Sequence, residues 1–199
     1  MYGWTGKILH IDLTDRAHGV EQPAEALYHT RIGGKGLAGA YLRPHATRDW
    51  RDPEMPLLFM TGPLVGTVSP TSGRMCIMSR SPLTGTIGDA SVGGQLGTQI
   101  KRASFDGIVI TGRSKRSVGI EIANGIVTFR DATDCIGTTA TALYGQLKDR
   151  GAVALTGPAA ENGVLFSSVM VDGAYTAGRN GLGLIFAAKN LKYVTVSGT

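Results

Sequence analysis

Leu57-Leu-Phe-Met-Thr-Gly-Pro63 and Val153-Ala-Leu-Thr-Gly-Pro158 share one pattern, an apolar run of strand length that ends in the triplet Thr-Gly-Pro. A short, uninterrupted apolar run closed by turn-forming residues predicts a buried β-strand. Glycine-rich turns and then a glycine-led helical pattern follow each triplet. The agreement favours two related halves around one cleft. Chance occurrence of so short a triplet is the alternative, and both interpretations stay open at this point.

Working outward from these two runs, the chain alternates between strand and helix patterns without a regular order. The Asn124-Gly125 pair between two apolar runs predicts a tight hairpin. Helices are predicted over 23–30, 37–42, 93–103, 138–150 and 184–191, and the Gly33–Gly36 run is interpreted as a helix-ending turn. Further strands are predicted over 7–13, 74–79, 105–111, 118–123, 126–129, 164–170 and 193–196. Because strands outnumber helices and the helices are not regularly interleaved, a doubly wound parallel sheet is not expected.

Composition is that of an ordinary globular protein with one excess. Glycine contributes 29 of 199 residues, roughly twice its usual share, which indicates many tight turns and close backbone approaches. The net charge of +5 suggests an anionic partner. The basic residues are scattered, so nucleic acid is not expected to be that partner. Without a signal-peptide pattern or a long apolar run, we expect a cytoplasmic protein that does not enter the membrane.

Side chains that carry catalysis are scarce. The sequence has no phosphate-binding P-loop, no GxSxG nucleophile motif and no HExxH zinc motif. Its histidines (His10, His18, His29 and His45) all lie near the start and are interpreted as surface or structural residues. Cys76 and Cys135 are too few for a metal cluster; a disulfide is possible, but a buried apolar role suits Cys76 better. Such a chain either binds a molecule or takes its chemistry from a cofactor.

Two glycine-rich segments, 72–94 and 177–183, each precede a predicted helix. Free amides at a helix N-terminus, with glycines that allow close approach, can form an anion site. Arg74 and Arg179 would add positive charge. We therefore predict that the two glycine-opened helix ends together form a floor for a phosphate-bearing ligand. Taken singly, each segment would be only a tight turn between a strand and a helix.

Taken in order, a string of short motifs resembles the successive signatures of the N-terminal domain of the aldehyde:ferredoxin oxidoreductase family. The resemblance extends over essentially all 199 residues. The motifs are Gly6–Ile8, Ile32–Leu37, Thr61–Leu64, Ser81–Gly85, Gly93-Gly94, Phe105–Ile108, Gly157–Asn162, Asp172-Gly173, Ala177–Arg179 and Ala188–Lys192.

The resemblance implies an α+β fold of two pseudo-symmetric β-sheets with a few peripheral helices. In the family these sheets form a base for two pyranopterin dithiolenes, which a magnesium ion joins at their phosphates. The dithiolene sulfurs hold tungsten, or sometimes molybdenum. The domain itself then needs no metal ligand and no catalytic side chain. The implied reaction is the oxidation of an aldehyde to a carboxylic acid, with electrons passed through a [4Fe-4S] cluster to ferredoxin.

Four residues match the family pattern of cofactor contacts as they stand. Arg74 matches a basic residue that contacts a pterin, and Gly93 matches a backbone contact. Gly178 and Arg179 match the corresponding motif later in the chain. The resemblance therefore implies that these four residues bind the cofactor.

Three further positions carry over with changes or through the backbone alone. Ser91 lies where the family usually has asparagine near the magnesium-linked phosphates, and Tyr175 lies where arginine is usual. Thr176 lies where a backbone carbonyl faces magnesium. The changes at Ser91 and Tyr175 remove one amide and one positive charge, which leaves open a variant cofactor geometry or a relative without the cofactor.

We therefore expect residues 1–199 to form a single pterin-binding N-terminal domain, inactive alone, with the cluster-binding domains absent from this chain. A larger subunit or further domains would supply the cluster, and we expect an oligomer or a permanent partner. Two alternatives remain: a cofactor-free scaffold or assembly subunit that keeps the fold, and a phosphate- or nucleotide-binding module.

Overall fold

The computed structural model describes residues 3–199. A first half of the chain forms one six-stranded sheet with the order β2-β1-β6-β3-β4-β5. In this sheet β1 and β6 are parallel, and every other neighbouring pair is antiparallel. Its strands are β1 (Ile8–Asp12), β2 (Ala17–Glu21), β3 (Leu57–Met60), β4 (Met75–Arg80), β5 (Ile87–Val92) and β6 (Gly107–Thr111).

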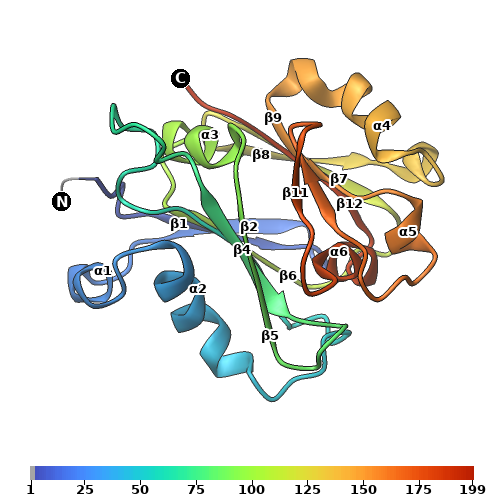
Figure 1. The fold of residues 1–199 in the computed structure, drawn as a ribbon, viewed down its shortest axis with the longest axis horizontal. Coiled ribbons are helices and arrows are strands. Elements are labelled where there is room, and N and C mark those ends of the chain that lie inside the picture. Colours follow the sequence, from blue (N-terminus) through green and yellow to red (C-terminus); the bar gives the residue numbers. More distant parts are fainter. Residues whose placement is uncertain (1–2) are drawn as a thin grey trace.

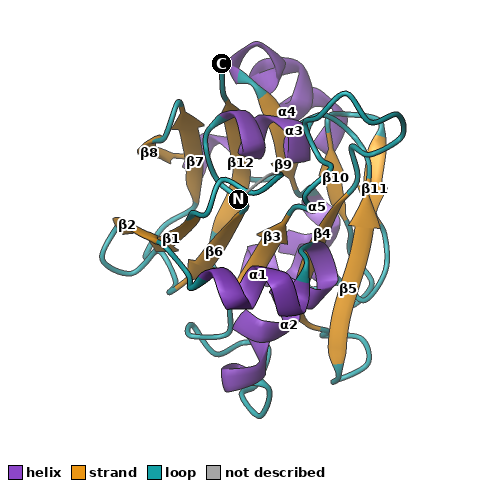
Figure 2. Cartoon of the chain, turned by 90° about the vertical axis from the view of Figure 1, so that its left-hand side faces the viewer, coloured by secondary structure: helices purple, strands orange, loops and turns teal. Residues whose placement is uncertain are grey.

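The second half repeats this topology. Its sheet has the order β8-β7-β12-β9-β10-β11, with β7 and β12 as the parallel pair. Figure 2 shows the two sheets one above the other, with their strands in matching order. The strands are β7 (Val118–Ala123), β8 (Ile126–Asp131), β9 (Ala152–Leu155), β10 (Val169–Val171), β11 (Tyr175–Ala177) and β12 (Leu191–Ser197). The predicted relation between the two halves is confirmed.

The two Thr-Gly-Pro triplets occupy equivalent places, directly after β3 and β9. The amide of Thr61 donates to the carbonyl of Asp106 (2.9 Å), just before β6. The amide of Thr156 likewise donates to the carbonyl of Lys192 (3.2 Å), in β12. Each triplet thus extends the pairing of a central strand by one bond before the chain turns away. The shared triplet marks the same structural position in both halves.

Helices lie on the outer faces of both sheets and also between them. The helices are α1 (Glu25–Arg31), α2 (Gly34–Leu42), α3 (Leu96–Arg102), α4 (Ala140–Leu147), α5 (Pro158–Glu161) and α6 (Leu182–Ala188), with single 3₁₀ turns at Arg43–His45, Thr133–Cys135 and Lys148–Arg150. Leu37 of α2 belongs to an apolar cluster on the first sheet, and Leu143 of α4 belongs to one on the second. Figure 1 shows these two helices at opposite sides of the molecule.

The main core lies between the two sheets. Alternate side chains of both inner faces bury there together with residues of α3 and α6. Phe59 of β3 and Phe186 of α6 meet edge to face, with ring centroids 6.1 Å apart. Burial of this shared apolar surface is the main force that joins the halves. The predicted α+β fold of two pseudo-symmetric sheets with a few peripheral helices is confirmed.

Several elements differ from the sequence prediction. The segment 87–92 is strand β5 rather than a glycine-rich loop, and β2, β11 and α5 had no predicted counterpart. Conversely, the strand predicted over 164–170 overlaps β10 (Val169–Val171) only in its last two residues. The edge strands β2, β5 and β11 give a weak local signal, because they are short or contain glycine and polar residues that are depleted in strands.

The Gly33–Gly36 run is also different from the predicted turn, because α2 already begins at Gly34. The amide of Gly34 donates to the carbonyl oxygen of Thr61 (2.9 Å). A Cβ atom on Gly33, where φ is +158°, would lie 2.7 Å from that same oxygen. Gly33 is therefore required for the close approach of α2 to the end of β3.

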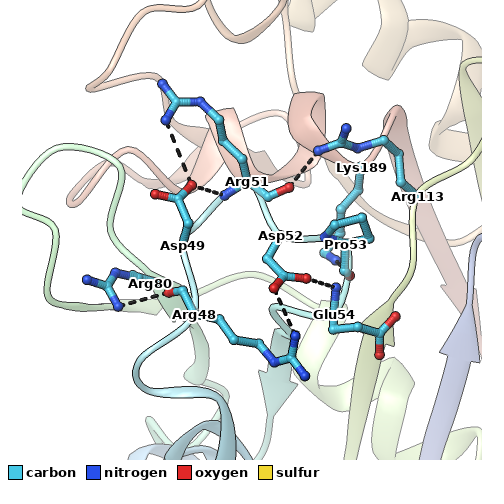
Figure 3. A network of polar contacts seen from close by, with 9 residues as sticks. All are labelled: Arg48, Asp49, Arg51, Asp52, Pro53, Glu54, Arg80, Arg113 and Lys189. Carbon is cyan, nitrogen blue, oxygen red and sulfur yellow. Dashed lines mark hydrogen bonds and ion pairs between the residues drawn. The ribbon is translucent and has the colours of Figure 1, made fainter.

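A loop before β3 ties the first half to the second (Figure 3). The Lys189 ammonium, only 2% exposed, donates to the carbonyls of Pro53 (2.7 Å) and Gly112 (3.1 Å). The Arg113 guanidinium donates to the carbonyl of Arg51 (2.6 Å). These bonds satisfy loop carbonyls and hold the loop against the end of α6.

Within residues 3–199, none of the helices is long and apolar enough to cross a bilayer. Two of the histidines pair with carboxylates on the surface, His10 with Glu21 (2.6 Å) and His29 with Glu25 (3.3 Å). Cys76 and Cys135 are free thiols, and Cys76 is buried in β4. These residues therefore have the structural roles that the sequence suggested.

Candidate cofactor-binding site

A polar cavity of about 430 Å³ opens where β5 of the first sheet lies beside β11 of the second. Cavities of this size are typical of sites that bind small molecules and cofactors. Both halves of the chain contribute to the wall. The lining residues are Lys35, Arg74, Asp89, Ala90, Ser91, Thr176, Gly178 and Arg179.

Strand register shows that the two walls of this cavity are equivalent. Ser91 pairs with Cys76 across β4 and β5, and Thr176 pairs with Met170 across β10 and β11. Cys76 and Met170 in turn pair with the last residue of β3 and of β9, respectively. Ser91 and Thr176 therefore occupy the same position in the two halves.

The glycines that follow continue this equivalence. Gly93 and Gly178 each stand two residues after the equivalent pair Ser91 and Thr176. The ring of Tyr175 lies against Gly93, where an added Cβ would be 3.0 Å from the ring. Tyr175 itself remains 49% exposed. Gly93 thus provides the space for the ring of Tyr175.

The seven residues predicted from the sequence come together here. Arg74, Ser91, Thr176, Gly178 and Arg179 line the cavity, and Gly93 and Tyr175 contact each other beside it. All seven residues therefore lie in or beside this one cavity.

The cavity carries more positive than negative charge. Lys35, Arg74 and Arg179 supply three cationic groups, and Asp89 supplies one carboxylate. Arg74 donates to the carbonyl of Ser91 (3.0 Å), which holds its guanidinium along β5. A partly enclosed surface with net positive charge attracts phosphate groups, and guanidinium forks match their geometry.

Lys35 and Asp89 are the charged lining residues that the sequence analysis missed. Their ammonium and carboxylate groups are 2.5 Å apart. The hydrogen bond from Lys35 to Asp89 and the Asp89 charge raise the pKa of Lys35. The smaller effect of burial lowers it. A lysine within a glycine run was the available signal, but the run was interpreted only as a helix end.

The predicted floor of two helix N-termini is wrong. The amide of Gln95, just before α3, donates to the carboxylate of Asp172 (2.6 Å). The amide of Gly183, in the first turn of α6, donates to the carbonyl of Ser167 (3.0 Å). Both amides are therefore occupied within the protein. The edges of β5 and β11, and the loop that follows β11, form the cavity instead.

Metal binding by side chains has little support in the part of the chain that the structure describes. Residues 3–199 contain no group of three or more His, Cys, Asp and Glu side chains placed to hold a metal ion. Burial raises the pKa of the Cys76 thiol, which lies behind Ser91, to about 12. That thiol is neutral at physiological pH and unsuited to bind a metal. The donor set fits a phosphate-bearing group whose metal brings its own ligands.

Comparison with known proteins identifies relatives over the whole chain. Residues 8–198 match the family model described as aldehyde ferredoxin oxidoreductase, N-terminal domain. The tungsten-containing aldehyde ferredoxin oxidoreductase of Pyrococcus abyssi is 38% identical over 205 residues, covering 100% of this chain and 34% of the relative. The WOR-like subunit of an aliphatic sulfonate oxidoreductase of Pyrococcus furiosus is 32% identical, covering 100% of this chain and 35% of that subunit.

A solved structure has the same fold. The active-site complex BamBC of benzoyl coenzyme A reductase, in complex with 1,5-dienoyl-CoA, superposes with a TM-score of 0.92 and 31% sequence identity. The match covers 100% of this chain and 31% of that chain. This chain therefore spans about a third of the length of the relatives it matches.

Proposed function

Because the chain belongs to the aldehyde ferredoxin oxidoreductase family, whose N-terminal domain it matches, we propose that it holds a tungsten bis-pyranopterin cofactor in the cavity between β5 and β11. Residues 1–199 would act as one pterin-binding domain. The names of the tungsten-containing relatives support the metal, and molybdenum is the alternative.

The equivalence of Ser91 with Thr176 is the observation that carries this proposal. A cofactor with two like pterin halves needs a surface that presents similar backbone groups twice. The cavity does so with Ser91 from one half and with Thr176 from the other.

The chain's own residues would bind and orient the cofactor. Arg74 and Arg179 would form charge-assisted hydrogen bonds to the phosphates. The hydroxyl of Ser91 and the carbonyl of Thr176 offer oxygen atoms of the kind that magnesium prefers. When bound, the tungsten centre would supply the two-electron oxidation of an aldehyde to a carboxylic acid.

The remaining parts of the enzyme belong to the same proposal. The chain spans about a third of its relatives, so a larger subunit or further domains would carry the [4Fe-4S] cluster and pass electrons to ferredoxin. The chain would be inactive alone and would form an oligomer or a permanent complex. Cytoplasmic location is part of this proposal as well.

Cofactor analysis of the purified protein tests the proposal. A tagged chain would be purified from its native host grown with tungstate, together with any partners that remain bound. We expect tungsten by mass spectrometry and a fluorescent pterin after oxidative release. Protein that contains neither, from tungstate-fed cells, would favour a cofactor-free scaffold instead.

Matched arginine variants refine this test. Arg179→Gln removes a cation from the cavity and should lower the pterin content roughly tenfold, since a lost charge-assisted hydrogen bond costs about 1.5–3 kcal/mol. Arg43→Gln is the control, because Arg43 is exposed and makes no side-chain hydrogen bond or ion pair within residues 3–199. Equal pterin content in both variants would contradict the assignment of Arg179.

A further inference from the structure

We propose that Lys35 is a third cationic contact for the anion bound in the cavity, and that Asp89 is the counter-ion that positions Lys35 and limits the affinity of the site. The inference deepens the proposed function and rests on it only for the presence of a phosphate-bearing ligand. Lys35 lies within the Ile32–Leu37 motif, but neither Lys35 nor Asp89 was among the predicted cofactor contacts.

The fold fixes where Lys35 can reach. Lys35 is the second residue of α2, whose start is held by the contact of Gly33 and Gly34 with the carbonyl of Thr61. Leu37 of the same helix is fully buried against the first sheet. The Lys35 side chain therefore points along the edge of that sheet toward β5. It remains 60% exposed and lines the cavity.

Asp89 lies where three chain segments meet. Its carboxylate contacts Lys35 of α2, at 2.5 Å. Its backbone carbonyl accepts a hydrogen bond from the Asn180 side-chain amide (2.8 Å). Asn180 directly follows Arg179, so Asp89 also fixes the loop that presents this arginine to the cavity. One aspartate thus helps to place two of the three cationic side chains.

The charges around Lys35 make it available to a ligand. Asp89 raises the pKa of Lys35, and the nearby Arg179 opposes this shift. Lys35 therefore stays protonated while it stands close to another cation. An arriving phosphate would compete with Asp89 for the ammonium group and would be repelled by the Asp89 carboxylate. The two members of the pair should then affect anion binding in opposite directions.

Titration with pyrophosphate tests this directly. Isothermal titration at low ionic strength would compare the 199-residue chain with its Lys35→Met and Asp89→Asn variants. We expect Lys35→Met to weaken binding roughly tenfold, the effect of losing one charge-assisted hydrogen bond. Asp89→Asn should strengthen binding several-fold. Arg43→Gln is again the control, with an unchanged affinity.

A purely structural ion pair gives a different result. If the pair only held α2 against β5, both variants would weaken binding or leave it unchanged, and equal affinities of Lys35→Met and the unmodified chain would overturn the inference. Thermal unfolding of each variant identifies any loss of folded protein. Pyrophosphate contains neither pterin nor tungsten, so opposite shifts would support this inference even in a chain that purifies without the cofactor.

Discussion

The two halves of the molecule share a strand order but fill equivalent positions with different side chains. Before β6, the buried Asp106 accepts hydrogen bonds from the amides of Thr5 (3.0 Å) and Gly6 (2.8 Å) and pairs with Lys101. The equivalent residue in the second half is Lys192, which pairs with Glu161. The buried charge has changed sign while the backbone bond from each Thr-Gly-Pro triplet is kept.

Side-chain size is exchanged in a similar way across the parallel strand pairs. Ile8 of β1 stands beside Gly107 of β6. At the equivalent place in the second half, Gly119 of β7 stands beside Tyr193 of β12. Each pair combines one glycine with one large side chain, but on opposite strands. The comparison teaches that backbone pairing sets the topology, and that each half needs only a locally complementary set of side chains.

Breaking the buried ion pair of the first half should have the largest effect. Asp106→Asn would leave the Lys101 ammonium buried without a charged partner, since these side chains are 0% and 8% exposed. Breaking a buried pair typically costs about 3–5 kcal/mol of unfolding free energy. Glu161→Gln also leaves a buried ammonium, since Lys192 is 3% exposed, but it should cost less because the Glu161 side chain is 22% exposed and water can take the place of the lost charge. Urea denaturation measures both, and equal losses would contradict this contrast.

Adding a methyl group at Gly119 should have the next largest effect. Its Cβ would lie 2.0 Å from the ring of the buried Tyr193. Overpacking of this kind costs about 1–3 kcal/mol, and we expect Gly119→Ala to fall at the upper end. Combining Gly119→Ile with Tyr193→Gly copies the size pattern of the first half. The double variant should lose less stability than the sum of the single changes; additive losses would show that the two positions are not complementary.

Lys189 directly follows α6, and Ala103 directly follows α3 at the equivalent place in the first half. The two helix ends therefore differ by one buried charge. Burial lowers the pKa of Lys189 to about 8 from an ordinary 10.5. The folded chain therefore binds fewer protons than the unfolded chain between these pH values. The unfolding free energy therefore rises with pH between about 8 and 10.5. Below pH 8 Lys189 is charged in both states, and the folded chain bears the full cost of burying that charge.

The corresponding measurement compares the natural chain with Lys189→Met. Between pH 7 and pH 10, the unfolding free energy of the natural chain should gain roughly 2 kcal/mol relative to the variant, since one pKa unit corresponds to about 1.4 kcal/mol. Using the difference between two proteins removes the titration of groups that they share. A constant difference across this range would show that Lys189 titrates normally.

Much of the fold could be predicted because its signals are local. The apolar runs at 57–60 and 153–155 and the Asn124-Gly125 turn specify β3, β9 and the β7–β8 hairpin from neighbouring residues alone. In the structure Asn124 and Gly125 both have positive φ, as such a turn requires. The edge strands β5 and β11 pair with the strands directly before them in sequence. They could not be predicted because glycine and polar residues in β5, and the three-residue length of β11, leave no clear apolar pattern.

The candidate site was predictable only in part, because it joins segments that are distant in sequence. The family motifs led to Arg74, Arg179 and their neighbours, which do lie at one cavity. The role of Lys35 depends on how α2 crosses the first sheet, which no local pattern specifies. The helix-end hypothesis failed because Asp172, far from α3 in sequence, already accepts the amide hydrogen bond.

The parallel pairing of β1 with β6, and of β7 with β12, also has a kinetic consequence. The first and last strands of each half cannot hydrogen bond until everything between them has been gathered. The chain loses conformational entropy when such long loops close, before the stabilising contacts between these strands have formed. Folding should therefore be slow compared with helical proteins of similar size. During synthesis on the ribosome, all strands of the first sheet emerge before those of the second. The nascent first half would therefore expose the apolar inner face that later packs on the second sheet. We expect the polypeptide to be prone to aggregation at this stage.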